Sequence, residues 1–385
     1  MSTDVTATLA ALVVIWLAAK LGGEVMERLG QPAVLGELLA GVLIGPGVLG
    51  LVRETEVLHL LAEIGVVLLL FEIGLESDLD ELLKAGTQST AVAVAGVACP
   101  FIAGFALAAW WGKPTLVAVF IGATLTATSV GITARVLSDL GRLQELASKV
   151  ILGAAVLDDI LGLVILAVVT GLAQTGQFSW GAATFILGKA LAFLLLAIAL
   201  GIRAAPTLVR WVGRMRARGS LIVYAVIFCV ALAVTAHAIG LATIIGAFAA
   251  GLVLAKTDRR EHIEERIKPV ADLFVPIFFV AIGMKVDPLA LSPFAQAEGF
   301  ALALLLTVVA VATKLASGLA VYRRGIRCWL VGVGMVPRGE VGLIFAGLGL
   351  ASGLIEAPLY AGLVGMVMVT TFVVPPWLKA LYRRA

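Results

Sequence analysis

Long apolar runs, separated by short polar intervals, follow one another along almost the whole sequence. An α-helix needs about 20 predominantly apolar residues to cross the hydrocarbon core of a bilayer, which is about 30 Å thick. Thirteen runs have roughly this length. They cover residues 5–22, 33–50, 57–75, 89–111, 115–137, 147–172, 181–209, 220–238, 240–256, 269–286, 298–322, 328–352 and 356–378. We therefore predict an all-α polytopic membrane protein with thirteen transmembrane helices.

The composition supports a membrane protein and excludes an ordinary soluble domain. Of the 385 residues, 61% are hydrophobic and 14% are charged, whereas soluble domains carry about 25% charged residues. The first run has no basic residue before it and no convincing cleavage site, so we expect a retained helix rather than a signal peptide. The sequence contains no phosphate-cradling loop and no nucleophile–base arrangement. We therefore expect no enzyme, no resident cofactor and no nucleic-acid partner, with membrane lipid as the surroundings.

Basic residues are distributed unevenly between alternate polar intervals. Of the 28 Lys and Arg residues, 22 fall on one side of the predicted membrane, among them Arg135 and Lys149, while three fall on the other side and three within the runs. Cytoplasmic intervals of membrane proteins carry the excess of basic residues. We therefore expect the N-terminus outside and the C-terminus in the cytoplasm.

Two short motifs recur at nearly the same spacing. Residues 36–41 (GELLAG) resemble residues 246–251 (GAFAAG), and residues 71–75 (FEIGL) resemble residues 280–284 (VAIGM), with offsets of 210 and 209 residues. The matched runs stand seven apart, and because seven is odd the two copies would enter the membrane with opposite polarity. This pattern predicts the inverted repeat of a secondary transporter, with a binding site near the middle of the membrane.

Two of the runs contain residues that interrupt helices. Residues 124–133 read TLTATSVGIT and residues 334–342 read GMVPRGEVG, again about 210 residues apart. Pro337 lacks a backbone donor, and both stretches contain Gly, so each can unwind at mid-depth. A lone Thr more simply bonds back to its own helix, but matched positions in a repeat favour a break. We predict two crossed discontinuous helices.

Polar residues at these breaks are candidates for ion binding and for support. Unwound backbone exposes carbonyl oxygens that can coordinate a cation, and half-helix ends carry partial charges. Arg338 and Glu340 form a candidate local pair that would neutralise such ends. The residues expected to support the breaks are Thr126, Gly131, Pro337, Arg338 and Glu340.

The strongest candidate chemistry lies in residues 150–165, VILGAAVLDDILGLVI, where Asp158 and Asp159 interrupt an apolar run. One charged side chain at mid-membrane costs about 2.5–3.5 kcal/mol on insertion scales. Lys314 lies inside another run, and a buried ammonium requires a partner. Neighbouring helical residues point about 100° apart, so one acid would meet Lys314 and the other would meet solvent and ion. A purely structural salt bridge is the alternative, but it does not account for the second acid.

These residues carry a family resemblance that extends over almost the whole chain. The sequence resembles the monovalent cation:proton antiporters of the second cation/proton antiporter family, and most closely the NapA-type bacterial sodium/proton antiporters. The matching stretches are residues 31–32 and 36–46, 71–76, 126–135, 151–159, Lys314, and 337–342.

The resemblance implies an NhaA/NapA-like homodimer in a bacterial inner membrane. It implies dimerisation-domain helices in residues 1–86 and 219–290, core helices in 87–175 and 291–385, and a linker helix in 176–218. It also implies that Asp159 is the principal ion and proton carboxylate, that Asp158 pairs with Lys314, and that Thr128 and Ser129 neighbour the ion. Relatives with Asn-Asp and Arg are usually electroneutral, whereas Asp-Asp with Lys resembles the electrogenic exchangers.

We predict an electrogenic sodium or lithium/proton antiporter that works by alternating access, with Na⁺ or Li⁺ held by Asp159 and Asp158. One alternative is a potassium/proton antiporter or potassium-efflux protein, which typically adds a nucleotide-binding domain that we do not expect after Ala385. A sodium-coupled organic-anion symporter of related fold is a second possibility, and a channel is a third. Transport assays with Na⁺, Li⁺ and K⁺ separate these possibilities.

Overall fold

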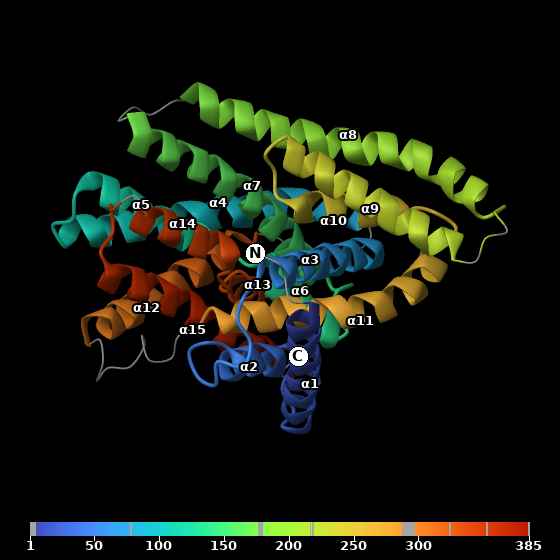
Figure 1. The fold of residues 1–385 in the computed structure, drawn as a ribbon. Helices are drawn as coiled ribbons and strands as arrows, with labels where there is room; N and C mark the ends of the chain where they lie inside the picture. Colours follow the sequence, from blue (N-terminus) through green and yellow to red (C-terminus); the bar gives the residue numbers. More distant parts are fainter. Residues whose placement is uncertain are drawn as a thin grey trace.

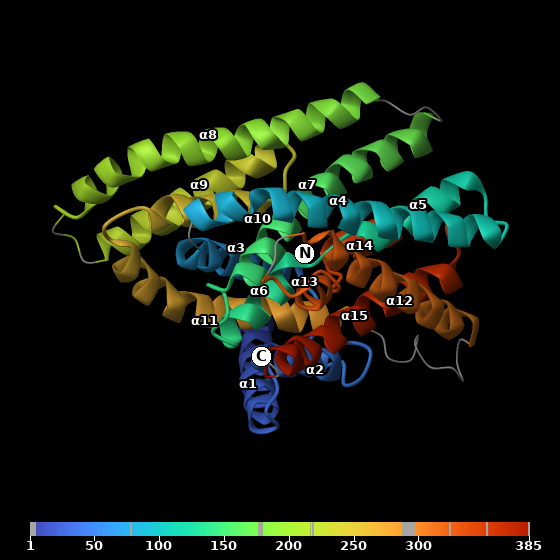
Figure 2. The ribbon, with the colours of Figure 1, turned by 180° about the vertical axis from the view of Figure 1, so that it is seen from behind.

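The computed structural model describes residues 5–77, 79–175, 180–215, 217, 219–286, 297–322, 325–351 and 353–383, and over these residues the chain is helical without strands (Figures 1 and 2). The helices are α1 Val5–Arg28, α2 Ala33–Ile44, α3 Glu56–Glu76, α4 Leu79–Trp110, α5 Thr115–Thr126, α6 Val130–Asp139, α7 Leu146–Thr175, α8 Trp180–Val212, α9 Ser220–Ala238, α10 Thr243–Ala255, α11 Arg260–Met284, α12 Ala297–Ser317, the 3₁₀ turn η1 Gly318–Ala320, α13 Cys328–Gly334, α14 Glu340–Ala351 and α15 Ala357–Arg383.

Within the described part of the chain, nine helical segments are long and apolar enough to cross a membrane. The count of thirteen crossings stays a prediction. Two runs hold helices shorter than expected. Helix α2 has 12 residues and ends before Gly45 and Pro46, because the residue before a proline is disfavoured in the helical conformation, and Gly45 is extended here. Helix α10 has 13 residues and begins after the turn at Gly240, whose φ is +77°. At 1.5 Å per residue, each is about 20 Å long or less.

One group of helices packs through glycines. Helix α3 lies along α10 and α11, and α2 lies along α1 and α11. A Cβ placed on Gly74 would lie 2.5 Å from the Phe248 carbonyl oxygen and 2.9 Å from the Gly251 Cα. A Cβ on Gly41 would lie 2.9 Å from the Gly283 Cα. Small residues of this kind let apolar helices approach closely in a membrane.

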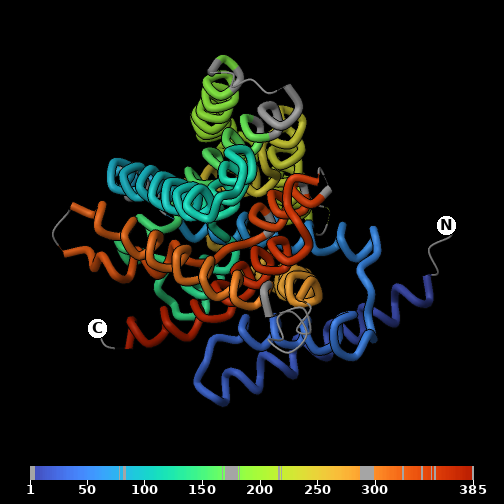
Figure 3. Tube along the Cα trace, turned by 90° about the vertical axis from the view of Figure 1, so that its left-hand side faces the viewer, coloured from blue at the N-terminus to red at the C-terminus, as the bar shows by residue number. Residues whose placement is uncertain are grey.

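A second group consists of α4, α5, α7, α12 and α15, with the short helices α6, α13 and α14 among them. Helix α8 lies at one edge of the molecule, against α7, α9 and α10, and α1 lies at the opposite edge (Figures 1 and 3). The two groups meet where α3 lies against α6 and where α2 lies against α6 and α15.

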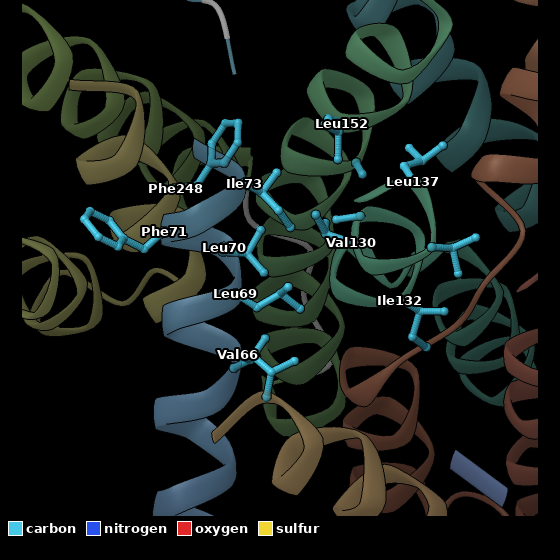
Figure 4. Close-up of a cluster of buried hydrophobic side chains, with 14 of the residues drawn as sticks. Val66, Leu69, Leu70, Phe71, Ile73, Val130, Ile132, Leu137, Leu152 and Phe248 are labelled. Carbon is cyan, nitrogen blue, oxygen red and sulfur yellow. The ribbon is translucent and has the colours of Figure 1, made fainter. Parts of the chain in front are cut away.

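The contact between α3 and α6 is apolar. Side chains of α3 point toward those of α6 and α7 and fill the space between these helices (Figure 4). The buried α3 residues at this contact are Val66, Leu69, Leu70 and Ile73. Val130 of α6 and Leu152 of α7 lie nearest to them, whereas Ile132 and Leu137 lie on the side of α6 away from α3 (Figure 4).

Candidate functional site

Two helical segments stop and restart beside each other. Helix α5 ends at Thr126 and α6 begins at Val130, while α13 ends at Gly334 and α14 begins at Glu340. The Ser129 N–H donates to the Pro337 carbonyl at 2.8 Å, and the Thr133 hydroxyl donates to the Gly334 carbonyl at 2.7 Å. Backbone groups that lose their helical partners at these interruptions therefore form hydrogen bonds with the other segment. Buried backbone polar groups require such partners.

Local sequence explains why the interruptions form here. Pro337 removes a backbone donor from the second segment. A Cβ on Gly339 would lie 2.8 Å from the Ser129 Oγ, and a Cβ on Gly334 would lie 2.6 Å from the Ile151 side chain. Both glycines therefore allow a close approach that a larger residue would prevent.

Arg338 lies between the interruptions of the two segments and is 0% exposed. Its Nη1 donates to the carbonyls of Thr126 at 3.2 Å and Ala127 at 2.7 Å, and its Nη2 donates to the Ala310 carbonyl at 3.2 Å. The last carbonyls of a helix lack intrahelical partners and carry partial negative charge. Arg338 therefore satisfies the end of α5. The side chain of Glu340 lies outside the described residues, so the Arg338–Glu340 pair stays a prediction.

The acid that meets Lys314 is Asp158. The Lys314 Nζ on α12 lies 3.3 Å from both carboxylate oxygens of Asp158 on α7, and the two side chains are 0% and 1% exposed. The Thr128 side chain lies near the same carboxylate, and its hydroxyl donates to the Met335 carbonyl at 3.5 Å. The unwound residues of the first segment thus lie beside the ion pair.

Asp159 follows on the same helix and is also buried, with 7% of its surface exposed. It is close enough to Lys314 to interact electrostatically, as Arg338 is to Asp158. The structure therefore brings Thr128, Asp158, Asp159 and Lys314 to the point where the interrupted helices meet, with Ser129 bonded at its backbone. Carboxylate, hydroxyl and carbonyl oxygens are the ligands that hard cations prefer.

A cavity of about 430 Å³ lies between α3, α11 and α14. Its polar lining includes Glu54, His59, Glu63 and Lys285. Val66 and Phe278 line it as well, and they are also the side chains nearest to a Cβ placed on Gly131, at 3.7 and 3.4 Å. One layer of apolar side chains therefore separates this cavity from the first turn of α6.

A partly buried charged cluster at the far end of α6 was not predicted. Arg135, which we counted with a polar interval, lies within α6; its side chain is 17% exposed and its Nε lies 2.9 Å from the Asp139 carboxylate. Asp139 lies near the Val34 N–H at the start of α2, and Glu37 of α2 is 3% exposed. The isolated acid in the apolar GELLAG motif was the available signal. Lys149, counted in the same way, lies within α7 and is 4% exposed.

An all-helical chain with ion-paired charges between apolar helices defines a membrane transport protein, because such charges are otherwise too costly to keep in a bilayer. The sequence profile described as "Sodium/hydrogen exchanger, transmembrane" matches residues 9–384. The chain belongs to this family of antiporters.

Individual relatives agree with this assignment. The chain is 42% identical to the high-affinity Na⁺/H⁺ antiporter NhaS3 of Synechocystis, over 98% of this chain and 90% of that protein. It is 39% identical to the Na⁺/H⁺-K⁺ antiporter GerN of Bacillus cereus, over 96% and 94%. The sodium proton antiporter MjNhaP1 of Methanocaldococcus jannaschii has a similar fold, with a TM-score of 0.70, 17% identity, and 97% and 95% of the two chains covered.

Proposed function

We propose that this protein exchanges Na⁺ or Li⁺ for protons at a single site formed by Asp159, Asp158 and Thr128. The observation that carries the proposal is the fully buried Asp158–Lys314 pair, which adjoins a second acid and an interrupted helix. A cation that enters this site competes with protons for the same carboxylate oxygens. The ion is the cargo, and no resident cofactor is required.

The exchange is proposed to be electrogenic because the site holds an amine as well as two acids. When Asp158 turns from Lys314 to the cation, a proton can leave from the amine in addition to those leaving the carboxylates. More than one proton then moves for each cation. The membrane potential contributes about 2.3 kcal/mol per elementary charge for each 100 mV.

Alternating access is the proposed route by which the site reaches each side. Core helices in residues 87–175 and 291–385 would move against dimerisation helices in residues 1–86 and 219–290, with residues 176–218 as the linker. The cavity between α3, α11 and α14 and the apolar α3–α6 contact support this division. With the N-terminus outside, as the basic residues predict, this cavity opens to the exterior.

The same proposal includes thirteen membrane crossings, an inverted repeat and two crossed discontinuous helices. Gly41 packs on Gly283 and Gly74 packs on Gly251, and the repeat relates one contact to the other. The repeat matches Gly41 to Gly251 and Gly74 to Gly283, so each of these two contacts is the counterpart of the other. This correspondence supports the repeat.

We also propose a homodimer in a bacterial inner membrane. The apolar face of α1 that supports it consists of Val5, Leu9, Val13, Leu17, Leu21 and Val25, all exposed.

Reconstituted transport tests the proposal. The protein is placed in proteoliposomes with an imposed pH gradient, and Na⁺-driven proton movement is recorded for the wild type and for Asp159→Asn. We expect exchange by the wild type and none by the variant, because one cation-binding carboxylate is lost. Persistent Na⁺-driven proton movement in Asp159→Asn refutes this assignment of the site.

Potassium is the second candidate substrate. It is favoured because GerN, a relative of 39% identity, is described as a Na⁺/H⁺-K⁺ antiporter. The same vesicles loaded with K⁺ in place of Na⁺ distinguish the two. If the K⁺ concentration that gives half-maximal exchange is equal to or lower than the Na⁺ concentration, K⁺ is the transported cation. The proposed site stays the same in that case.

A further inference from the structure

Most glycines in these helices have an evident packing reason. A Cβ on Gly104 of α4 would lie 3.0 Å from the Gly122 Cα, and a Cβ on Gly74 would lie 2.5 Å from a backbone oxygen. Gly96 of α4 is different. The three atoms nearest to a Cβ at this position all belong to side chains: the Lys314 Nζ at 3.3 Å and the Ser317 Cβ and Oγ at 3.7 Å.

Helix propensity gives no reason for a glycine at this position. Residues 91–98 read AVAVAGVA, so the surrounding helix consists of small helix-compatible residues. Glycine in a helix interior is less favourable than alanine. Gly96 therefore costs stability, and what it leaves free is space beside the amine of Lys314.

The surroundings of that amine indicate what the space is for. Helix α4 lies against both α7 and α12, the helices that carry Asp158 and Lys314. The amine lies 3.3 Å from each Asp158 oxygen, and it borders Gly96. The Ser317 hydroxyl, near the same position, donates to the Lys314 carbonyl at 2.6 Å. A hydroxyl oxygen that donates once still has lone pairs that accept a hydrogen bond from an amine.

We propose that Gly96 is a positioning residue of the transport cycle, which provides the space that the Lys314 amine enters when Asp158 turns to the transported cation. This inference rests on the exchange at Asp158 and Asp159 proposed above. The amine moves toward α4, where Ser317 accepts a hydrogen bond from it. Without this space the Lys314 amine would have to stay paired with Asp158, the carboxylate that the cation needs.

An added methyl group acts differently on the two positions of the amine. In the paired position the methyl carbon introduced by Gly96→Ala would lie 3.3 Å from the Nζ, a tight contact that a shift of a few tenths of an ångström relieves. Movement of the amine toward α4 would shorten that contact further. Gly96→Ala should therefore leave the ion pair intact and disfavour its release.

Initial rates of Na⁺/H⁺ exchange in proteoliposomes, measured over a range of Na⁺ concentrations, test the inference. The variants are Gly96→Ala and, as a matched control in the same helix, Gly86→Ala, whose Cβ would meet nothing within 4 Å. We expect the KM for Na⁺ of Gly96→Ala to rise about tenfold, which corresponds to about 1.4 kcal/mol, because the added methyl group crowds the released amine. Its maximal rate at saturating Na⁺ and its thermal stability should match those of Gly86→Ala.

Each other result contradicts the inference in a recognisable way. A KM for Gly96→Ala equal to that of Gly86→Ala, with exchange by the wild type, overturns the role of Gly96 alone. A variant that fails to fold, or that loses maximal rate and thermal stability at unchanged KM, shows that Gly96 serves helix packing instead. Absence of exchange by the wild type overturns the proposed function and this inference with it.

Discussion

Asp158 and Asp159 are adjacent and chemically identical, yet their removal should affect stability very differently. Asp158→Asn leaves the Lys314 ammonium, which is 0% exposed, without the carboxylate that lies 3.3 Å from it. Asp159→Asn leaves the contacts between Lys314 and the two carboxylate oxygens of Asp158 in place. The two variants therefore form a matched pair in which only the partner of the buried amine changes.

The size of the effect follows from the distance. Two unit charges 3.3 Å apart attract each other by about 5 kcal/mol at the effective dielectric constant of about 20 that suits protein sites. Removal of one partner from buried ion pairs typically costs about 3–5 kcal/mol. We therefore expect Asp158→Asn to lose about 3–5 kcal/mol of unfolding free energy. This corresponds to a decrease in Tm on the order of 5–10 °C.

Thermal unfolding of the purified variants in one detergent, without Na⁺ and at neutral pH, measures this loss. Asp159→Asn should unfold within a few degrees of the wild type. The double variant Asp158→Asn/Lys314→Gln should recover most of the loss, because neutral polar groups replace both charges. An equal decrease for Asp158→Asn and Asp159→Asn, or no recovery in the double variant, would refute the assignment of the pair as a stabilising contact.

Two further predictions concern helix packing and charge movement. Gly74→Ala places a methyl group 2.5 Å from a backbone oxygen of α10, so it should lose about 1–3 kcal/mol of stability, whereas Gly86→Ala should not. Equal Tm values for these two variants would contradict the packing argument. Lys314→Gln should weaken exchange and abolish the transport current, because no amine remains to release a proton. Simultaneous records of Na⁺ uptake and current test this, and an unchanged current per Na⁺ rules out the role of the amine.

Hydropathy located the longer helices, because a helix that crosses a bilayer needs about 20 predominantly apolar residues. Where a predicted run was longer than the observed helix, the local backbone explains the difference in length. Apolar character continues past Ile44, but Gly45 and Pro46 end α2 there. The interruption at Pro337 was predicted because proline also lacks the backbone donor that a helix uses. The interruption at residues 127–129 contains no proline and was predicted only through its spacing from the other break.

Contacts between distant helices were less accessible to sequence reasoning. Adjacent acids point about 100° apart, and the rotation of α7 that turns Asp158 toward Lys314 is set by packing against other helices. Residue spacing therefore left the choice open, and the family resemblance alone implied it. Arg135 illustrates a second limit, since a basic residue near the end of an apolar run looks the same in sequence whether it is solvated or partly buried beside Asp139.

The contacts around the site divide into bonds that join the interrupted helices and apolar contacts that border α3. Ser129, Thr133 and Arg338 connect the two segments by buried hydrogen bonds of 2.7–3.2 Å. Separation of the segments would leave these groups unsatisfied at about 1–3 kcal/mol each, whereas apolar surfaces slide without such a loss. In the exchange proposed above, a movement that carries the site would therefore take both segments together and pass along the apolar α3–α6 contact.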